Sequence, residues 1–239
     1  MTELGLRKAI IATALAMNAL GINRGKSGNV SARWKDGFLV TPSGLAYHRT
    51  KPADIVFVDR EGCAHGRLAP SSEWRFHHDI YRRRADARAV VHTHSSFATT
   101  LACLGREVPA FHYMIAVAGG NSIRCAPYAT FGTQQLSDHA LEALEERKAC
   151  LLANHGMIAI GESLDQALAL AVEVEALCEQ YWRALQVGQP NLLPDEEMAV
   201  VLAKFRTYGQ AEGTDRSGRS GRGPARTKDK AAFAAKGGK

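Results

Sequence analysis

The chain has 239 residues, 46% of them hydrophobic and 23% charged, which is typical of a soluble globular protein with a sizeable core. No apolar run reaches the roughly 20 residues that a membrane helix needs, and the first residues lack the apolar region of a signal peptide, so we expect a cytoplasmic protein with no membrane partner. The net charge of +6 is concentrated in residues 211–239, where eight basic residues accompany only three acidic ones, so we do not expect the main body to bind nucleic acid.

The spacing of apolar residues and of turn residues predicts that helices and strands alternate along the chain. In chain order, the expected elements are a helix over 3–20, a hairpin over 30–41, a strand over 55–58, a helix over 71–84, a strand over 89–93, a helix from 95 or 96, a helix over 134–147, strands over 150–154 and 157–160, and helices over 163–187 and 194–206. Ser71, Ser72 and Glu73 carry hydroxyl and carboxylate side chains suited to capping the helix that they open, as does Ser95 or Ser96 for the next helix.

Hairpins in this pattern exclude an all-parallel sheet. They predict a single-domain α/β/α layered fold over residues 1–210, in which helices flank a mixed, largely antiparallel sheet. The remaining residues, 211–239, contain almost no large apolar side chains and cannot bury enough surface to offset their ordering entropy. We therefore expect a basic disordered tail, more suited to a solvated appendage than to RNA contact.

An alternating histidine pair, His92-Thr93-His94, stands at the end of an apolar run. Residues i and i+2 of a strand point to the same side, so the two imidazoles can converge on one ion. His155 closes a second strand-like run, and Glu73 opens a helix, where a carboxylate is favoured by the helix dipole. Three histidines and one carboxylate predict a catalytic zinc site, although Mn²⁺, Fe²⁺ and Co²⁺ also suit these donors and Glu73 could serve only as a cap.

Three clusters of small residues at turns predict an anion site near the expected metal: 25–29, 41–44 and 70–72. Exposed backbone N–H groups, hydroxyls and a helix N-terminus together form a cradle for anions. One of the clusters adjoins Glu73, so the pattern favours a phosphorylated substrate beside the metal. No GxxxxGK[ST] run occurs, which excludes a P-loop.

Taken together, these segments resemble the class II aldolase/adducin family, and most of all its members that cleave L-fuculose 1-phosphate. The resemblance runs from the first helix to about Gly209 and rests on long motifs, among them Pro70-Ser-Ser-Glu-Trp-Arg-Phe-His77 and Ala89-Val-Val-His-Thr-His94. Further matching segments are 28–31, 115–122, 125–133, 154–156 and 204–209.

The resemblance implies one Zn²⁺ per subunit, bound by His92, His94 and His155 with Glu73 as the fourth ligand at rest. It also implies phosphate-binding positions, which are Gly28, Asn29, Ser43, Gly44, Ser71 and Ser72. Family members of this type are cyclic homotetramers with active sites between subunits. Tyr113 and Tyr208 match tyrosines that reach the site from the adjacent subunit, and Phe131 matches an aromatic residue near the aldehyde.

The implied reaction is the reversible cleavage of L-fuculose 1-phosphate to dihydroxyacetone phosphate and L-lactaldehyde. Zinc would stabilise the charge left by carbon–carbon cleavage, Glu73 would leave the metal and shuttle the proton at the carbon next to the phosphate ester, and Tyr113 would handle the proton on the aldehyde oxygen. The chain departs from the family pattern at Asn154, where histidine is frequent, and at Ser43, where threonine is commoner. The tail also extends past the usual C-terminus of the family, so Tyr208 is followed by residues that the family pattern lacks.

The same scaffold carries other activities, namely ribulose-5-phosphate 4-epimerases, a methylthioribulose-phosphate dehydratase and sugar-acid phosphate decarboxylases. Glu73 followed by Trp-Arg-Phe, together with Tyr113 in His-Tyr-Met, favours the aldolases, because an epimerase is expected to carry aspartate in place of Glu73. A metal-free interaction module like the adducin head is the remaining alternative. Such a module is expected to lose the metal ligands, and this chain keeps all of them.

Overall fold

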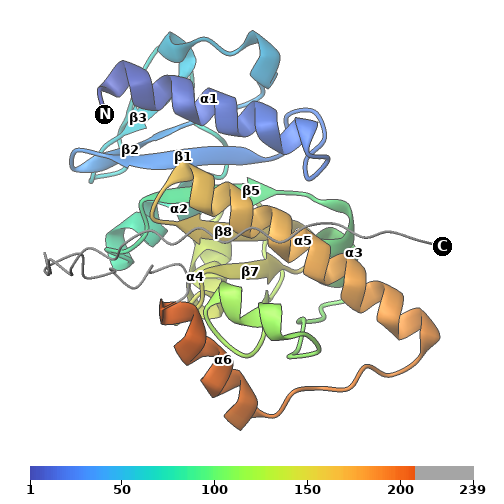
Figure 1. Ribbon diagram of the computed structural model, residues 1–239. Coiled ribbons are helices and arrows are strands. Elements are labelled where there is room, and N and C mark those ends of the chain that lie inside the picture. Colours follow the sequence, from blue (N-terminus) through green and yellow to red (C-terminus); the bar gives the residue numbers. More distant parts are fainter. Residues whose placement is uncertain (208–239) are drawn as a thin grey trace, which may run out of the picture. The chain divides into compact units, whose positions relative to one another are not determined.

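One mixed sheet forms the framework of the computed structural model, which describes residues 1–207 (Figure 1). The strand order is β4-β3-β2-β1-β5-β8-β7-β6, and neighbouring strands are antiparallel except for the parallel pair β6 and β7. The strands are β1 Asn29–Trp34, β2 Gly37–Val40, β3 Val56–Val58, β4 Ala64–His65, β5 Ala89–Thr93, β6 Cys125–Ala126, β7 Ala149–Leu152 and β8 Gly156–Gly161. Tyr208 and the basic tail lie outside the described residues, so the expectation that the tail is disordered stays a prediction.

Helices cover both faces of this sheet. On one face α1, α3 and α5 pack against β1, β5, β7 and β8, and on the other α2 and α4 pack against β2, β6 and β7. The helices are α1 Glu3–Ala19, α2 Trp74–Arg83, α3 Ser96–Cys103, α4 Gln134–Ala143, α5 Leu164–Val187 and α6 Asp195–Thr207, with short 3-10 turns η1 Tyr47–Arg49, η2 Pro52–Asp54 and η3 Tyr113–Ala118. The α/β/α layers and the largely antiparallel sheet confirm the predicted fold class. Within the described residues, no helix is long and apolar enough to span a bilayer.

Strand β5 shows how side-chain alternation sets up the two cores. Ala89 and Val91 join the core beneath α1, α3 and α5, whereas Val90 joins the core beneath α2 and α4. His92 continues the second series, and its ring meets Phe76 of α2 edge-on at a centroid distance of 5.4 Å. The strand therefore directs this histidine toward the layer from which Glu73 comes.

The structure differs from the sequence-based expectation at several places, one of them strand β4, which was not predicted. Helix α4 ends at Ala143 rather than near 147, since Glu146 has a left-handed φ of 56° that is incompatible with a continued helix. Strand β6 was not predicted, because two residues carry no periodicity. Ser95 precedes α3 as its N-cap residue, but its side chain makes no capping bond to the helix.

Candidate metal centre

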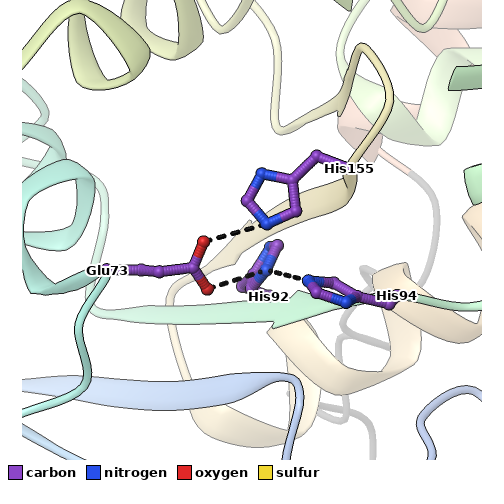
Figure 2. A group of neighbouring side chains, drawn as sticks. All are labelled: Glu73, His92, His94 and His155. Carbon is purple, nitrogen blue, oxygen red and sulfur yellow. Dashed lines mark hydrogen bonds and ion pairs between the residues drawn. The ribbon is translucent and has the colours of Figure 1, made fainter. Parts of the chain in front are cut away.

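Four side chains with metal-ligand atoms converge at the end of β5, as Figure 2 shows: Glu73, His92, His94 and His155. Their ligand atoms all lie within 4.8 Å of one another. The Nε2 atoms of His92 and His94 are 3.0 Å apart. Glu73 places Oε2 at 3.1 Å from Nε2 of His92 and Oε1 at 2.9 Å from Nε2 of His155. The structure thus brings together the complete set of residues that the sequence predicted as metal ligands.

Strand pairing and one tight turn place the histidines. His92 sits opposite Ile158 on β8 and Asn29 on β1, and its Nδ1 donates to the carbonyl of Met157 at 2.9 Å. His155 lies in the turn between β7 and β8, next to Asn154 with its left-handed φ of 55°. Gly156 is required there, because a Cβ would lie 2.5 Å from the carbonyl oxygen of Thr93. The close approach of the two strand ends therefore brings His155 to the histidine pair.

Glu73 occupies the N-cap position of α2, but its side chain makes no capping hydrogen bond. The carboxylate instead points into the histidine cluster and accepts a hydrogen bond from Nδ2 of Asn29 at 2.9 Å. The sequence left open the alternative that Glu73 serves only as a helix cap, and the structure contradicts that alternative. The side chain has better partners in the cluster, and the hydroxyl of Ser71 accepts from the Glu73 backbone N–H at 3.3 Å. A buried carboxylate among three imidazoles is a group that could hold a metal ion.

The atoms of this cluster fit a divalent cation. Because Nδ1 of His92 donates to Met157, its Nε2 carries a lone pair in the neutral ring, and this lone pair faces the carboxylate of Glu73. Oε1 of Glu73 is buried and, although it lies 2.9 Å from Nε2 of His155, it makes no well-aligned hydrogen bond within the described residues. Electron-pair donors packed this closely repel one another unless a cation lies among them. Nitrogen and oxygen donors of this kind are those that zinc and neighbouring transition metals prefer.

The electrostatics of the cluster favour the protonation states that bind metals. Burial, together with repulsion from His92 and His155, lowers the pKa of His94 to about 4, so its ring is neutral near pH 7. Burial alone would raise the pKa of Glu73, but the neighbouring His92 and His155 more than offset this and hold the pKa below its ordinary value. A neutral imidazole and an ionised carboxylate are the ligating forms.

The three turn clusters predicted to bind an anion come together in the fold. Gly28 and Asn29 open β1, Ser43 and Gly44 follow β2, and Ser71 and Ser72 precede α2. A backbone bond joins the second and third clusters, from the Ser71 N–H to the Thr41 carbonyl at 2.9 Å, and the Ser43 N–H donates at 3.0 Å to the carbonyl of Ala69, which precedes the third cluster. Lys26 of the first cluster donates through Nζ to the carbonyl of Gly44 at 2.8 Å. This lysine adds a positive charge that the sequence analysis did not assign.

A cavity of about 290 Å³ opens beside the cluster and is shaped by a loop of aromatic residues. It is lined by Ser27, Ser72, Glu73, His94, Tyr128, Ala129, Phe131, Asn154 and His155. Phe131 was predicted to lie near the substrate, whereas Ser27, Tyr128 and the amide of Asn154 were not. The signal available for Tyr128 was its place in the same loop as Phe131. A larger cavity, of about 370 Å³, is lined partly by β8 and α5 and shares no residue with this one.

Tyr113, one of the two tyrosines predicted to act in catalysis, is not among the residues that line this cavity. Tyr113 opens η3, is about half exposed and stacks against Phe205 of α6. Tyr208 lies outside the described residues. Their expected arrival from an adjacent subunit therefore stays a prediction.

Comparisons with known proteins agree with this geometry. A family model described as the class II aldolase and adducin N-terminal domain matches residues 8–182. A 5-methylthioribulose-1-phosphate/5-deoxyribulose-1-phosphate aldolase of Rhodospirillum rubrum is 59% identical over 208 residues, covering 87% of this chain and 94% of the relative. The L-fuculose phosphate aldolase of Escherichia coli is 53% identical over 205 residues, covering 85% and 95%. A solved L-fuculose 1-phosphate aldolase superposes with a TM-score of 0.82 at 40% identity, covering 84% of this chain and 96% of that one.

Proposed function

Since the chain belongs to the class II aldolase and adducin family and is a metal-dependent aldolase, we propose that its substrate is a 1-phosphoketose with a deoxygenated far end. The relatives named above act on 5-methylthioribulose 1-phosphate, 5-deoxyribulose 1-phosphate or L-fuculose phosphate. Cleavage between carbons 3 and 4 of such a ketose yields dihydroxyacetone phosphate and a short aldehyde. The aldehyde is L-lactaldehyde for L-fuculose 1-phosphate, acetaldehyde for the 5-deoxy sugar and methylthioacetaldehyde for the methylthio sugar.

The convergence of Glu73, His92, His94 and His155 is the observation that carries this proposal. These residues would hold the ion, for which zinc is our choice on the basis of the donor set. When bound, such an ion supplies Lewis-acid stabilisation of the negative charge that develops on the substrate oxygens. The remaining chemistry belongs to the side chains of this protein.

The phosphate would bind at the three turn clusters beside the metal centre. The proposed positions are Gly28, Asn29, Ser43, Gly44, Ser71 and Ser72, of which the serines offer hydroxyls, and the ammonium of Lys26 adds charge. The bonds between these turns support a preformed site. The phosphate then anchors one end of the ketose, and the carbonyl end is directed toward the histidines.

In the direction of condensation, Glu73 takes a proton from the hydroxymethyl carbon of dihydroxyacetone phosphate and not from the carbon next to the phosphate ester, because the new carbon–carbon bond forms at the hydroxymethyl carbon. That carbon attacks the aldehyde carbon, the new carbon–carbon bond forms, and the aldehyde oxygen receives a proton from the phenol of Tyr113 on a neighbouring subunit. Solvent returns the proton from Glu73 to Tyr113, which balances the cycle. We propose a homotetramer because Tyr113 does not line the cavity of its own chain, and we assign Tyr208 the same origin.

The aldehyde end would lie against Phe131 and Tyr128, whose rings line the cavity and suit a methyl or methylthio group. The greater identity to the Rhodospirillum rubrum enzyme favours 5-methylthioribulose 1-phosphate and 5-deoxyribulose 1-phosphate over L-fuculose 1-phosphate. The test is to measure kcat/KM for cleavage of all three ketoses, with and without EDTA. Cleavage that EDTA leaves unchanged, or cleavage of none of the three, would overturn the proposal.

A further inference from the structure

A continuous chain of buried hydrogen bonds leads from the metal centre to Tyr81. Oε2 of Glu73 accepts from Nδ2 of Asn29 at 2.9 Å, and Oδ1 of Asn29 lies 2.5 Å from Nε2 of His77. Nδ1 of His77 lies 2.7 Å from the hydroxyl of Ser31, which lies 2.8 Å from the hydroxyl of Tyr81. Each member except Glu73 lies outside the metal cluster, and all are buried.

Two regular periodicities create this chain. Asn29 and Ser31 are alternate residues of β1 and so share one face of the sheet, and His77 and Tyr81 are one turn apart on α2. The packing of α2 against the sheet interleaves the two pairs. The ring of His77 is further held between Phe38 and Phe76, with which it stacks at interplanar angles of 17° and 28°.

The ionised carboxylate at one end determines the direction of every bond. Glu73 can only accept, so the NH₂ group of Asn29 faces it and the amide oxygen faces His77. His77 must then donate from Nε2, which leaves Nδ1 to accept from Ser31. The hydroxyl of Ser31 has its proton engaged and accepts from Tyr81. Burial, and to a smaller extent His92, lowers the pKa of His77 to about 3, which agrees with a neutral ring.

We propose that His77, Ser31 and Tyr81 are positioning residues for the aldolase reaction, which orient the amide of Asn29 and thereby hold Glu73 at the metal centre. The proposal rests on the proton-shuttling role proposed for Glu73. Reversal of the Asn29 amide would place its oxygen against the carboxylate and its NH₂ group against the Nε2–H of His77, so both Glu73 and His77 oppose that reversal. A histidine that does not touch the proposed base thus helps to hold it in its resting position through Asn29.

The tautomer of His77 is directly measurable by ¹⁵N NMR on histidine-labelled protein, with the His77→Gln variant identifying the signal. We expect a neutral ring protonated at Nε2 and unprotonated at Nδ1. The opposite tautomer, or a protonated imidazolium, would overturn the proposal. This measurement needs no substrate, so it decides the direction of the chain even if the proposed function fails.

Ser31→Ala tests whether the chain matters for the reaction, and Ser137→Ala is its matched control. Both serines are fully buried, and each hydroxyl lies 2.7 Å from a side-chain atom of α2, but Ser137 bonds to Asp79 on the side away from this chain. We expect kcat/KM to fall about 10- to 100-fold for Ser31→Ala and to change less than about twofold for Ser137→Ala, with similar losses of thermal stability. Equal kinetic losses in the two variants, or none in Ser31→Ala, would show a merely structural role.

Replacing His77 itself supplies a rescue experiment. Glutamine can present an amide N–H to Asn29, whereas leucine cannot. We expect His77→Leu to lose more of kcat than Ser31→Ala does and His77→Gln to recover part of it. Tyr81→Phe, at the far end of the chain, should have the smallest effect. The proposal would be contradicted if the activities of these variants followed their thermal stabilities instead of this order of kcat losses. Glu73→Gln separately tests the role of the base on which the proposal depends.

Discussion

Glu175 of α5 accepts a hydrogen bond from the hydroxyl of Ser95, with 2.6 Å between Oε2 and Oγ. The same carboxylate accepts from the backbone N–H groups of Phe97 at 2.8 Å and Ala98 at 2.9 Å. It therefore replaces the serine as the cap of α3, and it does so directly after His94. A carboxylate from one helix thus secures the N-terminus of the helix that begins beside the metal centre.

We expect Glu175→Ala to lower the free energy of unfolding by about 0.5–2 kcal/mol, the range for loss of an N-cap. Chemical denaturation measures this loss, and metal analysis after dialysis shows whether the ligand loop is loosened as well. Glu179→Ala is a suitable control on the same helix, since its ion pair with Arg183 is exposed. A similar loss in both variants would argue against a capping role for Glu175.

His94→Ala should remove the metal from the protein, because it takes away one of three imidazoles while leaving the buried Glu73 and His92 in place. Metal analysis is expected to give close to one ion per subunit for the parent protein and close to none for the variant. Aldol cleavage should fall to background in the variant, and should return in EDTA-treated parent protein on addition of Zn²⁺. Retention of metal by the variant would contradict the proposed ligand set.

Glu73→Gln should separate binding of the metal from proton transfer. Glutamine keeps an oxygen at nearly the same place but cannot accept the substrate proton, so we expect kcat to fall by about 100- to 10,000-fold with most of the metal retained. Steady-state kinetics and metal analysis on the same sample measure both quantities. Near-normal turnover in the variant would exclude Glu73 as the base.

Asp79 is expected to make stability depend on pH. Burial raises the pKa of this carboxyl, but hydrogen bonds from Gln134, Ser137 and His78 outweigh burial and hold the pKa below its ordinary value. The contribution of ionised Asp79 to the free energy of unfolding is therefore complete above the ordinary aspartate pKa of about 4. It is lost as the pH falls through the lower pKa that Asp79 has in the folded protein. The difference in unfolding free energy between the parent and Asp79→Asn should shrink over that range. Denaturation curves from pH 7 down to the acid limit measure it.

Asn154→Gly should alter substrate preference. Glycine adopts the left-handed φ of 55° without strain, so the variant removes the amide that lines the cavity and keeps the turn. L-Lactaldehyde carries a hydroxyl that acetaldehyde lacks, and an amide is suited to bind it. We expect kcat/KM to fall for L-fuculose 1-phosphate and to change little for 5-deoxyribulose 1-phosphate. An equal change for both ketoses would show that Asn154 does not contact that hydroxyl.

Much of the fold could be predicted because its signals are local. The apolar alternation of 89–93, the Asp36-Gly37 turn and the helical spacing of 163–187 each lie within one segment, and the structure has β5, the β1–β2 hairpin and α5 there. The candidate site was foreseeable for a similar reason, because His92 and His94 share one face of a strand whatever surrounds it. Strand β6 and the end of α4 depend on contacts with other segments, and local patterns do not contain those contacts.

By itself, the sequence determined the longer helices and strands and which side chains carry metal-binding atoms. Only the tertiary structure decided between roles that are equally compatible with one position. Glu73 occupies a capping position yet points into the histidine cluster. His77 joins Asn29 to Ser31, and Glu175 caps a helix far from it in sequence. The physical reason is that a hydrogen bond depends on atoms within about 3 Å, and packing between helices and sheet brings such atoms together.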